Sequence, residues 1–315
     1  MSPRSAAWFS LLPVSALVLA GCSTGASGED ETAAETVAVD AENGEIEVEA
    51  DPETVVVFDN TQLDILDALG VDVAGIPAAD AVPGFFDHHA EDETVENVGS
   101  LFEPDLEAVA GLDPDLIISG GRSSDATPQL EEIAPTIDMT TDSADTLGSL
   151  NDRVLAYGEI FDKADEARAL AAEFEERTEE VGELVSGSGD GLVVITTAGE
   201  ISAYGPGSRY GFFYDDLGLE PTLDVTSDDA RHGEVLSFEA LADADPDWLY
   251  VIDRDTAIGE EGASPAGQVL DNELVNRTTA AEEDQILYLD SEEVYLVGGV
   301  QAHLNVLDDI EDALS

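Results

Sequence analysis

Three of the few basic residues in this chain stand where they could bind an anion. Arg122 follows two glycines, Arg209 follows a Gly-Pro-Gly-Ser turn, and Arg254 comes at the end of a predicted strand. Guanidinium groups on turns can point into a cleft, where they form forked, charge-assisted hydrogen bonds to oxyanions. The alternative is that each arginine pairs with a nearby carboxylate, such as Asp215 or Asp255. Because basic residues are so scarce here, we favour an anionic ligand.

The charge of the chain is extreme. Its 315 residues include 72 acidic and 10 basic side chains, for a net charge of −62, and only one of the basic residues is a lysine. Nucleic-acid binding needs clustered basic residues, so we exclude it. The hydrophobic fraction of 43% is that of a globular protein. Self-repulsion is screened in concentrated salt, where the Debye length is about 3 Å at 1 M, so we expect a salt-adapted, monomeric protein.

The N-terminus has the features of a bacterial lipoprotein signal peptide. Residues 1–22 contain Arg4, then a short apolar stretch, and end in Leu-Ala-Gly-Cys. Cys22 is the only cysteine in the chain, which excludes a disulfide framework. We therefore expect a protein lipid-anchored at Cys22 on the extracytoplasmic face of the cell membrane. Residues 23–51 are acidic and poor in large apolar residues, so we expect a disordered tether, in which 46–48 could form a short strand.

The folded body alternates short apolar runs with stretches of helical periodicity, which is typical of α/β units. We predict two Rossmann-like α/β lobes joined by a long α-helix, with a ligand cleft between the lobes. The N-terminal lobe covers 52–146, the linking helix (one helix or a pair) covers 147–186, and the C-terminal lobe covers 187–315.

An internal repeat supports two related lobes. Residues 106–122 and 238–254 share seven of seventeen positions, among them Glu107 with Glu239 and Arg122 with Arg254. Each copy predicts a short helix, an Asp-Pro-Asp turn, a buried strand and then an arginine at the carboxyl end of that strand. Ligands of open α/β sheets bind beyond the carboxyl ends of the strands, so the repeat places Arg122 and Arg254 at such an end.

The remaining candidate residues give weaker signals. His232 lies in a polar loop, adjacent His88 and His89 lie in an acidic one, and His303 lies on a predicted helix. They form no obvious zinc pattern. For His88 and His89 we favour an exposed, solvated pair over a weak divalent-metal site. Sequence motifs for a catalytic serine, a zinc protease or a phosphate-binding loop are missing, so we expect a binding protein and not an enzyme.

The sequence resembles a known family, the substrate-binding lipoproteins of ABC importers for iron–siderophore complexes. Cobalamin-binding proteins share the fold of that family. The stretches that carry the resemblance are VVVFDNTQLDILDALGV (55–71), VENVGSLFEPDLEAVAGLDPDLIISGGR (95–122), YGPGSRYGFFYDDLG (204–218), HGEVLSFEALADADPDWLYVIDRD (232–255) and LDNELVNRTTAAEEDQILYLD (270–290). Together they look like the branch that binds ferric catecholates, including petrobactin.

The resemblance implies roles for particular residues. In that branch three arginines contact the anionic iron complex, and they correspond to Arg122, Arg209 and Arg254. A histidine and a tyrosine complete the iron shell when the siderophore supplies only four donors; they correspond to His232 and Tyr295. Imidazole and oxygen donors are both suitable ligands for iron.

The resemblance also implies partners. Glu107 and Glu239 would dock the two lobes onto an ABC permease dimer, which works with its ATPase. The transported ligand would be a Fe(III)–siderophore complex, and no cofactor would be permanently bound. Cobalamin, haem, or a hydroxamate or citrate siderophore on the same fold stays an alternative, as does the different class of an acidic cell-surface scaffold.

Overall fold

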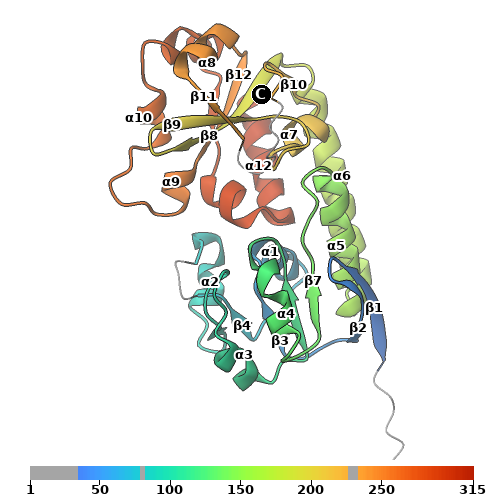
Figure 1. The fold of residues 1–315 in the computed structure, drawn as a ribbon. Coiled ribbons are helices and arrows are strands. Elements are labelled where there is room, and N and C mark those ends of the chain that lie inside the picture. Colours follow the sequence, from blue (N-terminus) through green and yellow to red (C-terminus); the bar gives the residue numbers. More distant parts are fainter. Residues whose placement is uncertain (1–34, 79–81, 226–232) are drawn as a thin grey trace, which may run out of the picture. The chain divides into compact units, whose positions relative to one another are not determined.

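The structure is a computed structural model that describes residues 35–78, 82–225 and 233–315. Two larger β-sheets and one two-stranded hairpin form within this part of the chain, and Figure 1 shows helices packed around the larger sheets. The predicted signal peptide, Cys22 and His232 lie outside the described residues. Within the described part, no helix combines the length and the apolar character that crossing a membrane requires.

The first sheet consists of five parallel strands in the order β5-β4-β3-β6-β7, counting the described residues only. Its central strand is a run of three fully buried valines, as expected when helices cover both faces of a parallel sheet. The strands are β3 (Val55–Val57), β4 (Gly75–Ile76), β5 (Glu96–Asn97), β6 (Leu116–Ser119) and β7 (Thr136–Asp138). The helices and helical turns among them are α1 (Asn60–Ala68), η1 (Gly84–Phe86), α2 (Asp87–Ala90), α3 (Leu106–Leu112), η2 (Gly121–Ala126) and α4 (Thr127–Leu130).

The second sheet is mixed, in the order β11-β9-β8-β12-β13, with β10 also paired to β8. Strands β8, β12 and β13 run parallel, whereas β9 returns antiparallel to β8. The strands are β8 (Asp190–Thr197), β9 (Glu200–Tyr204), β10 (Glu220–Pro221), β11 (Glu234–Leu236), β12 (Trp248–Asp253) and β13 (Ile286–Tyr288). The helices and helical turns are α7 (Phe212–Asp215), α8 (Phe238–Ala244), α9 (Arg254–Ala257), α10 (Ala266–Leu270), η3 (Val275–Arg277), α11 (Thr279–Glu282), the π-helical turn η4 (Glu293–Val297) and α12 (Val300–Leu314).

The segment between the sheets is a pair of helices and not one long helix. Helix α5 (Thr146–Ile160) and helix α6 (Ala164–Val185) pack against each other, and both lie on the same side of the two sheets in Figure 1. Asp162 between them has a φ of 52°, which ends the first helix. The pair was one of the two alternatives that the sequence left open for 147–186.

The prediction of a disordered tether up to residue 51 is wrong for residues 36–49, although the short strand that it allowed at 46–48 is present within β2. Residues Thr36–Ala41 (β1) and Gly44–Glu49 (β2) form an antiparallel hairpin. In β2 the apolar residues alternate with glutamates, and in β1 burial alternates although the sequence does not, so that Val39 and Val48 are buried while the acidic side chains of both strands face out. Period-two alternation is the pattern of a half-buried strand, even in a segment whose composition is mostly acidic.

The two copies of the internal repeat have the same local structure. Helices α3 and α8 are capped at their N-termini by Asp105 and Ser237. Both helices end at an aspartate in the left-handed conformation, Asp113 with a φ of 51° and Asp245 with a φ of 54°. Strands β6 and β12 follow, and each is the second strand from one edge of its sheet. The repeat is therefore a structural one, as the sequence predicts.

The C-terminal segment ties the two halves of the described chain together. Thr61 on α1 donates to the main-chain carbonyl of Val297 on η4, at 2.8 Å. The fully buried carboxylate of Asp64 accepts the main-chain N–H groups of Gln301 and Ala302, at 2.9 and 3.0 Å, and so caps α12 from a different helix. One hydrophobic core includes residues of β3, β8, α6 and α12.

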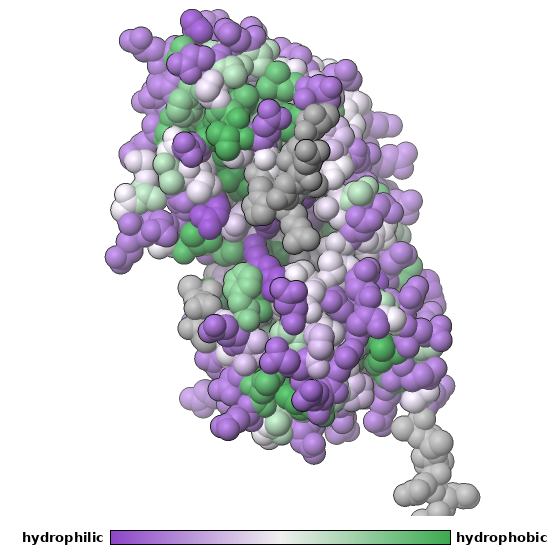
Figure 2. Space-filling view, in the orientation of Figure 1, coloured by the Kyte–Doolittle hydropathy of each residue, from purple (hydrophilic) through white to green (hydrophobic). Residues whose placement is uncertain are grey.

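The exterior matches the composition. Hydrophilic residues cover most of the face drawn in Figure 2, and apolar residues gather there in smaller patches. The acidic side chains implied by the net charge of −62 are accommodated on the surface and not in the core. Asp59, Asp64, Asp138 and Asp255 are buried exceptions, and each of them accepts hydrogen bonds from main-chain N–H groups.

Candidate functional site

A cavity of about 1120 Å³ lies where the carboxyl ends of strands from both sheets meet. Residues that follow β3, β6 and β7 line it from the first sheet, and residues that follow β8, β9 and β12 line it from the second. This is the position at which ligands of open α/β sheets bind. The turn η4 and the first part of α12 complete the wall. We refer to this cavity as the cleft.

Three arginines converge on one tyrosine in the cleft. The Nη2 atoms of Arg122 and Arg209 donate to the main-chain carbonyl of Tyr295, at 2.8 and 2.6 Å. The Nε atom of Arg254 donates to the phenol oxygen of the same residue, at 3.0 Å. The guanidinium carbons of Arg122, Arg209 and Arg254 lie 5.4, 4.4 and 5.7 Å from the centre of the Tyr295 ring. Each cation thus lies within range of a cation–π contact.

Tyr295 owes this position to an irregular turn. It lies in the middle of η4, a single π-helical turn that ends at Gly298 in the left-handed conformation. Single π-turns occur frequently at functional sites. Here three successive carbonyls of the turn accept hydrogen bonds from groups outside it. The carbonyl of Tyr295 accepts from Arg122 and Arg209. The carbonyl of Leu296 accepts from Asn60, and that of Val297 accepts from Thr61.

Arg122 is positioned by the glycines that precede it. Gly121 has a φ of 49°, and a Cβ atom there would lie 2.9 Å from the carboxylate of Asp59. A glycine therefore allows the chain to turn closely past Asp59 as β6 ends and η2 begins. Asp59 itself caps α1 by accepting the N–H of Gln62. Burial raises the pKa of its carboxyl, although the hydrogen bond from Gln62 and the positive charge of Arg122 both act to lower it.

Arg209 and Arg254 are held by acidic side chains that bind the main chain. In the Gly-Pro-Gly-Ser turn before Arg209, the N–H of Gly207 donates to Asp215 at 2.7 Å. Arg254 is the first residue of α9, which Asp253 caps through Thr256 N at 3.0 Å. Of the carboxylates that could have neutralised these arginines, Asp215 is engaged with the main chain, and Asp255 lies 3.6 Å from Arg254.

The clustered charges shift the titration of the groups inside the cleft. Burial lowers the pKa of Arg122, and the neighbouring charge of Arg209 lowers it further. Burial by itself raises the pKa of Tyr295, but the hydrogen bond from Arg254 and the charges of Arg254 and Arg209 outweigh it, so the pKa lies below its usual value. Positive charge concentrated in the cleft explains the lowered pKa of Tyr295, whereas at Arg122 it adds to the larger effect of burial.

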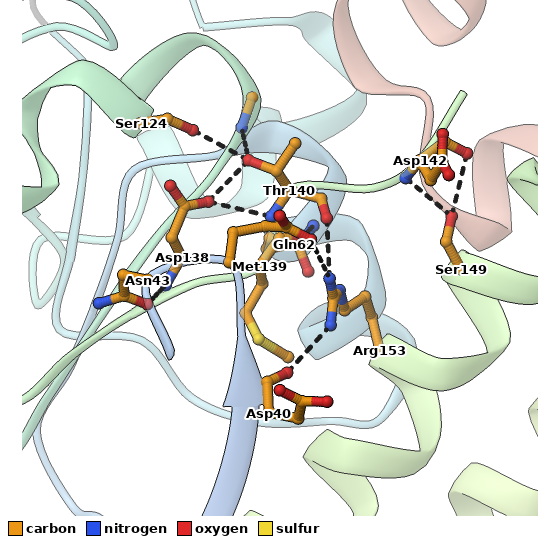
Figure 3. Close-up of polar contacts among 12 residues, drawn as sticks. Asp40, Asn43, Gln62, Ser124, Asp138, Met139, Thr140, Asp142, Ser149 and Arg153 are labelled. Atoms are coloured by element: carbon orange, nitrogen blue, oxygen red, sulfur yellow. Dashed lines mark hydrogen bonds and ion pairs between the residues drawn. The ribbon is translucent and has the colours of Figure 1, made fainter. Parts of the chain in front are cut away.

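The floor of the cleft on the first sheet is a network of polar contacts around Thr140 (Figure 3). The Thr140 hydroxyl donates to Asp138 at 2.6 Å and accepts the N–H of Gly121 at 2.8 Å. Arg153 of α5 reaches in and donates to the carbonyls of Thr140, at 2.9 Å, and of Asp40 in β1, at 3.3 Å. The network joins the hairpin and α5 to the loop that carries Arg122, and so it makes a rigid base for that arginine.

Among the described residues, the structure brings the three arginines and the tyrosine predicted as ligand contacts together in the cleft. Arg122, Arg209, Arg254 and Tyr295 all line it, and so does His303. Glu107 and Glu239 do not line the cleft and are exposed on the first turns of α3 and α8. His303 of α12 is packed between Phe174 and Phe212, and its Nδ1 lies 2.7 Å from the carbonyl of Gly299.

Several lining residues were not among the sequence candidates. Tyr204 and Tyr210 stand on either side of the Gly-Pro-Gly-Ser turn, and their rings meet edge to face. Phe102 contributes an exposed apolar side chain to the cleft, with 69% of its surface accessible. Asp59 and Thr140 both follow a strand of the first sheet, so the strand-end argument that identified Arg254 would have found them as well.

Comparison with known proteins gives a consistent result. The chain matches the periplasmic binding protein family over residues 55–293. It is 37% identical to petrobactin-binding protein YclQ of Bacillus subtilis over 309 residues, which cover 96% of each chain. It is 30% identical to ferric-anguibactin-binding protein FatB of Vibrio anguillarum, over 82% of this chain and 81% of FatB.

Solved structures agree with these matches. The crystal structure of YclQ aligns with a TM-score of 0.84 at 36% identity, covering 89% of this chain and 99% of YclQ. The catecholate-siderophore binding protein VctP of Vibrio cholerae aligns with a TM-score of 0.82 at 28% identity, covering 88% of this chain and all of VctP. The predicted α/β fold is confirmed by these likenesses.

Proposed function

Because the chain belongs to the periplasmic binding protein family, we propose that it is the substrate-binding receptor of an ABC importer and captures an anionic ferric siderophore in its cleft. The convergence of Arg122, Arg209 and Arg254 on Tyr295 carries the proposal. YclQ, FatB and VctP are named for siderophores, and catecholates are the class that suits this cleft best. The role is transport and not catalysis.

The chemistry of a ferric catecholate fits this arrangement. A ferric tris-catecholate carries net negative charge, so moving it out of water requires fixed positive donors. Two of the three guanidiniums now donate to a main-chain carbonyl, and they can exchange that neutral acceptor for catecholate oxygens. The cavity of about 1120 Å³ is large enough for a ligand of this size.

A bis-catecholate leaves two coordination positions of the iron free. We propose that the phenolate of Tyr295 takes one of them, since Fe(III) is a hard ion that prefers oxygen donors. Its lowered pKa reduces the cost of losing the phenol proton. His232 takes the other position in this proposal, on the strength of the sequence resemblance alone, because it lies outside the described residues.

Ligand titration tests the proposal directly. The protein, kept in concentrated KCl, is titrated with ferric bis- and tris-catecholates, a ferric hydroxamate, ferric citrate, haem and cobalamin, while tyrosine fluorescence is followed. We expect saturable quenching at submicromolar ferric catecholate. A response to hydroxamate, citrate, haem or cobalamin alone would keep the receptor and replace the ligand. No response to any of them, in protein shown to be folded, would favour the surface-scaffold alternative.

We propose that Glu107 and Glu239 dock the two lobes onto the permease. Both are exposed, and both occupy the same position of the repeated helix–turn–strand unit. A double Glu107→Ala, Glu239→Ala variant should bind ligand normally and fail in uptake. Glu175→Ala with Glu176→Ala on the exposed side of α6 removes the same charge elsewhere and serves as the control. Normal uptake by the first variant would refute the assignment.

We further propose that Cys22 carries the lipid anchor and that the acidic surface is an adaptation to salt. Replacing Cys22 with serine should release the protein from membranes into the medium.

The salt adaptation has a separate test. The free energy of unfolding should rise with KCl concentration, because salt screens the repulsion among acidic side chains. Maximal stability in dilute buffer would contradict the salt adaptation without affecting the proposed ligand.

A further inference from the structure

A second group of chemically active side chains lies outside the cleft, between α1 and α2. Asp67 is in the last turn of α1, and His88 and His89 are the two central residues of the short helix α2. His88 Nε2 is 2.9 Å from Asp67 Oδ1, and His89 Nε2 is 3.3 Å from the same oxygen. None of the three lines the cleft.

The convergence of the two histidines is unusual. Side chains of adjacent helical residues normally point in directions about 100° apart, so they do not face a common target. Here the two rings lie with their centres 4.1 Å apart and both turn to one carboxylate oxygen. The Nε2 atom of His89 is buried, yet it makes no hydrogen bond of normal geometry within the described part of the chain.

We propose that Asp67, His88 and His89 form a binding site for a divalent transition-metal ion, of which Zn²⁺ fits best. Two imidazole nitrogens and one carboxylate oxygen are a typical three-ligand set for Zn²⁺, with water in the fourth position. The three ligand atoms all lie within 4.8 Å of one another. Tetrahedral Zn²⁺ with bonds of about 2.0–2.2 Å separates its ligand atoms by roughly 3.3–3.6 Å. Small side-chain rotations therefore suffice to admit the ion.

The surroundings suit a metal ligand set. The side chain of Asp67 is 28% exposed beside both imidazoles, so its carboxylate can exchange these contacts for a metal ion. The side chain of His88 is 53% exposed, which leaves a route for the ion and room for water. The amide of Gln301 on α12 lies 3.4 Å from the other oxygen of Asp67 and orients the carboxylate.

A bound ion would connect elements that touch both sheets. It would tie α2 to the end of α1, whose Asp64 caps α12. Just before α2, the N–H of Gly84 donates to Glu292 beside η4, at 3.0 Å. With the ion bound, the segment 84–90 would be attached to α1 through Asp67 and to the residue before η4 through Gly84. Asp67, His88 and His89 do not themselves line the cleft. This inference does not depend on the proposed function.

Two simpler explanations compete with a metal site. The histidines, when protonated, could form an ordinary ion pair with Asp67. Alternatively, a chain with 72 acidic residues could collect divalent cations diffusely over its surface. A built site differs from both in having one ion per chain, a preference for Zn²⁺ over Mg²⁺, and dependence on the two histidines.

The test uses the full chain in detergent, stripped of metal by chelation and kept in 1 M potassium nitrate to screen diffuse binding. Zn²⁺ binding is followed by calorimetry, and Co²⁺ is used as a spectroscopic probe. We expect one Zn²⁺ per chain and the visible absorption of four-coordinate Co²⁺. His88→Ala, His89→Ala and Asp67→Asn should each weaken binding by more than about tenfold, since even outer-shell partners contribute that much.

Glu91→Gln is the matched control, because it removes the same charge as Asp67→Asn from the exposed residue that follows α2. Its Zn²⁺ affinity should be unchanged. Since His88 is exposed, His88→Ala should fold normally, which circular dichroism verifies. Equal Zn²⁺ binding by His88→Ala and the unmodified chain, equal affinity for Mg²⁺, or no stoichiometric site at all would each overturn the proposal.

Discussion

Arginines in this chain occupy two opposite settings, one on the surface and one in the cleft. On α6, Arg177 donates to three carboxylates: Glu180 at 2.9 Å, Asp308 at 2.8 Å and Glu311 at 2.6 Å. These hydrogen bonds, with that to Glu311 the strongest, raise the pKa of Arg177. Its charge is fully balanced, and it joins α6 to α12.

In the cleft the arginines have few carboxylate partners. Arg122 and Arg209 share one main-chain carbonyl as acceptor, and within the described part of the chain neither has a carboxylate within ion-pair distance. Burial and the charge of Arg209 lower the pKa of Arg122, the opposite of the shift at Arg177. Of the three cleft arginines, Arg254 alone has a carboxylate of the described chain within ion-pair distance, that of Asp255 at 3.6 Å.

The contrast shows which arginines are available to a ligand. In a chain with 72 acidic side chains, a partly buried arginine without a carboxylate partner needs a cause. A main-chain carbonyl satisfies the guanidinium hydrogen bonds without cancelling the charge. The cleft thus keeps positive charge that an anion can neutralise, whereas the charge of Arg177 is already neutralised by the carboxylates that it binds on α6 and α12.

The largest expected effect is on ligand affinity. Arg122→Ala, Arg209→Ala or Arg254→Ala should each weaken ferric-catecholate binding by about 1.5–3 kcal/mol, the usual value of a charged hydrogen bond. That corresponds to roughly 10–150-fold in the dissociation constant, measured by the fluorescence titration. Arg122→Lys separates charge from geometry: it should recover part of the loss, because lysine keeps the charge but not the forked donor. Unchanged affinity in all three alanine variants would remove the anion clamp.

The second prediction concerns the balanced arginine. Arg177→Ala should lower the free energy of unfolding by about 1–2 kcal/mol in dilute buffer, because it breaks a network of three partly exposed ion pairs. The loss should shrink in 1 M salt, where the Debye length is about 3 Å. Chemical denaturation at two salt concentrations measures both effects. Ligand affinity should not change; if it falls as far as in Arg122→Ala, the distinction between the two settings fails.

Asp64 is an acidic residue in a setting like that of the cleft arginines. Its hydrogen-bond partners are main-chain N–H groups and not oppositely charged side chains. Burial raises its pKa from 3.8 to about 7, despite the hydrogen bonds from Gln301 and Ala302. The folded state therefore holds a proton that the unfolded state loses above pH 4. It follows that this residue makes stability fall as the pH rises from about 4 to 7, and has no further effect above that range.

The test of this third prediction compares the chain with its Asp64→Asn variant between pH 4 and 8. An amide accepts hydrogen bonds through only one oxygen, so the variant should lose about 1 kcal/mol of the cap. The advantage of the unmodified chain over the variant should be greatest near pH 4, shrink as the pH rises, and reverse before pH 7, because only the unmodified chain loses stability over this range. Two stability curves that run parallel across this range would show that Asp64 stays ionised in the folded protein.

The sequence was informative where local rules decide structure. Strand ends, glycine turns and the repeat identified Arg122, Arg209 and Arg254, because a residue after a buried parallel strand must lie at the carboxyl edge of its sheet. It failed on the hairpin at 36–49, where the overall acidic composition concealed a period-two pattern of valines.

Contacts between distant segments could not be predicted in this way. Arg122 and Tyr295 are 173 residues apart, and they meet only because η4 adopts a π-turn that frees the carbonyl of Tyr295. The sequence assigned His88 and His89 to an exposed, solvated loop. Their approach to Asp67 depends on how α2 packs beside the end of α1, and no local pattern fixes that.

The smallest expected effect is spectroscopic, and it tests the charge of the cleft without any ligand. Tyr295 should be the first tyrosine of the cleft to ionise as the pH rises, because Arg254 and Arg209 lower its pKa below the usual value. Burial raises the pKa of Tyr210, Tyr214 and Tyr250, so these should ionise much later. Phenolate absorbance should therefore show an early step of one tyrosine, measured in 1 M KCl to screen the acidic surface.

Two variants assign that step. Tyr295→Phe should remove it, and Arg254→Ala should move it to higher pH, because the largest favourable interaction with the phenolate is lost. Arg177→Ala should leave it in place, since its charge lies on the helix surface and is already balanced by three carboxylates. An early step that survives Tyr295→Phe would mean that the three guanidiniums do not create a positive field at this ring, and the cleft would then be no more attractive to an anion than the surface around Arg177.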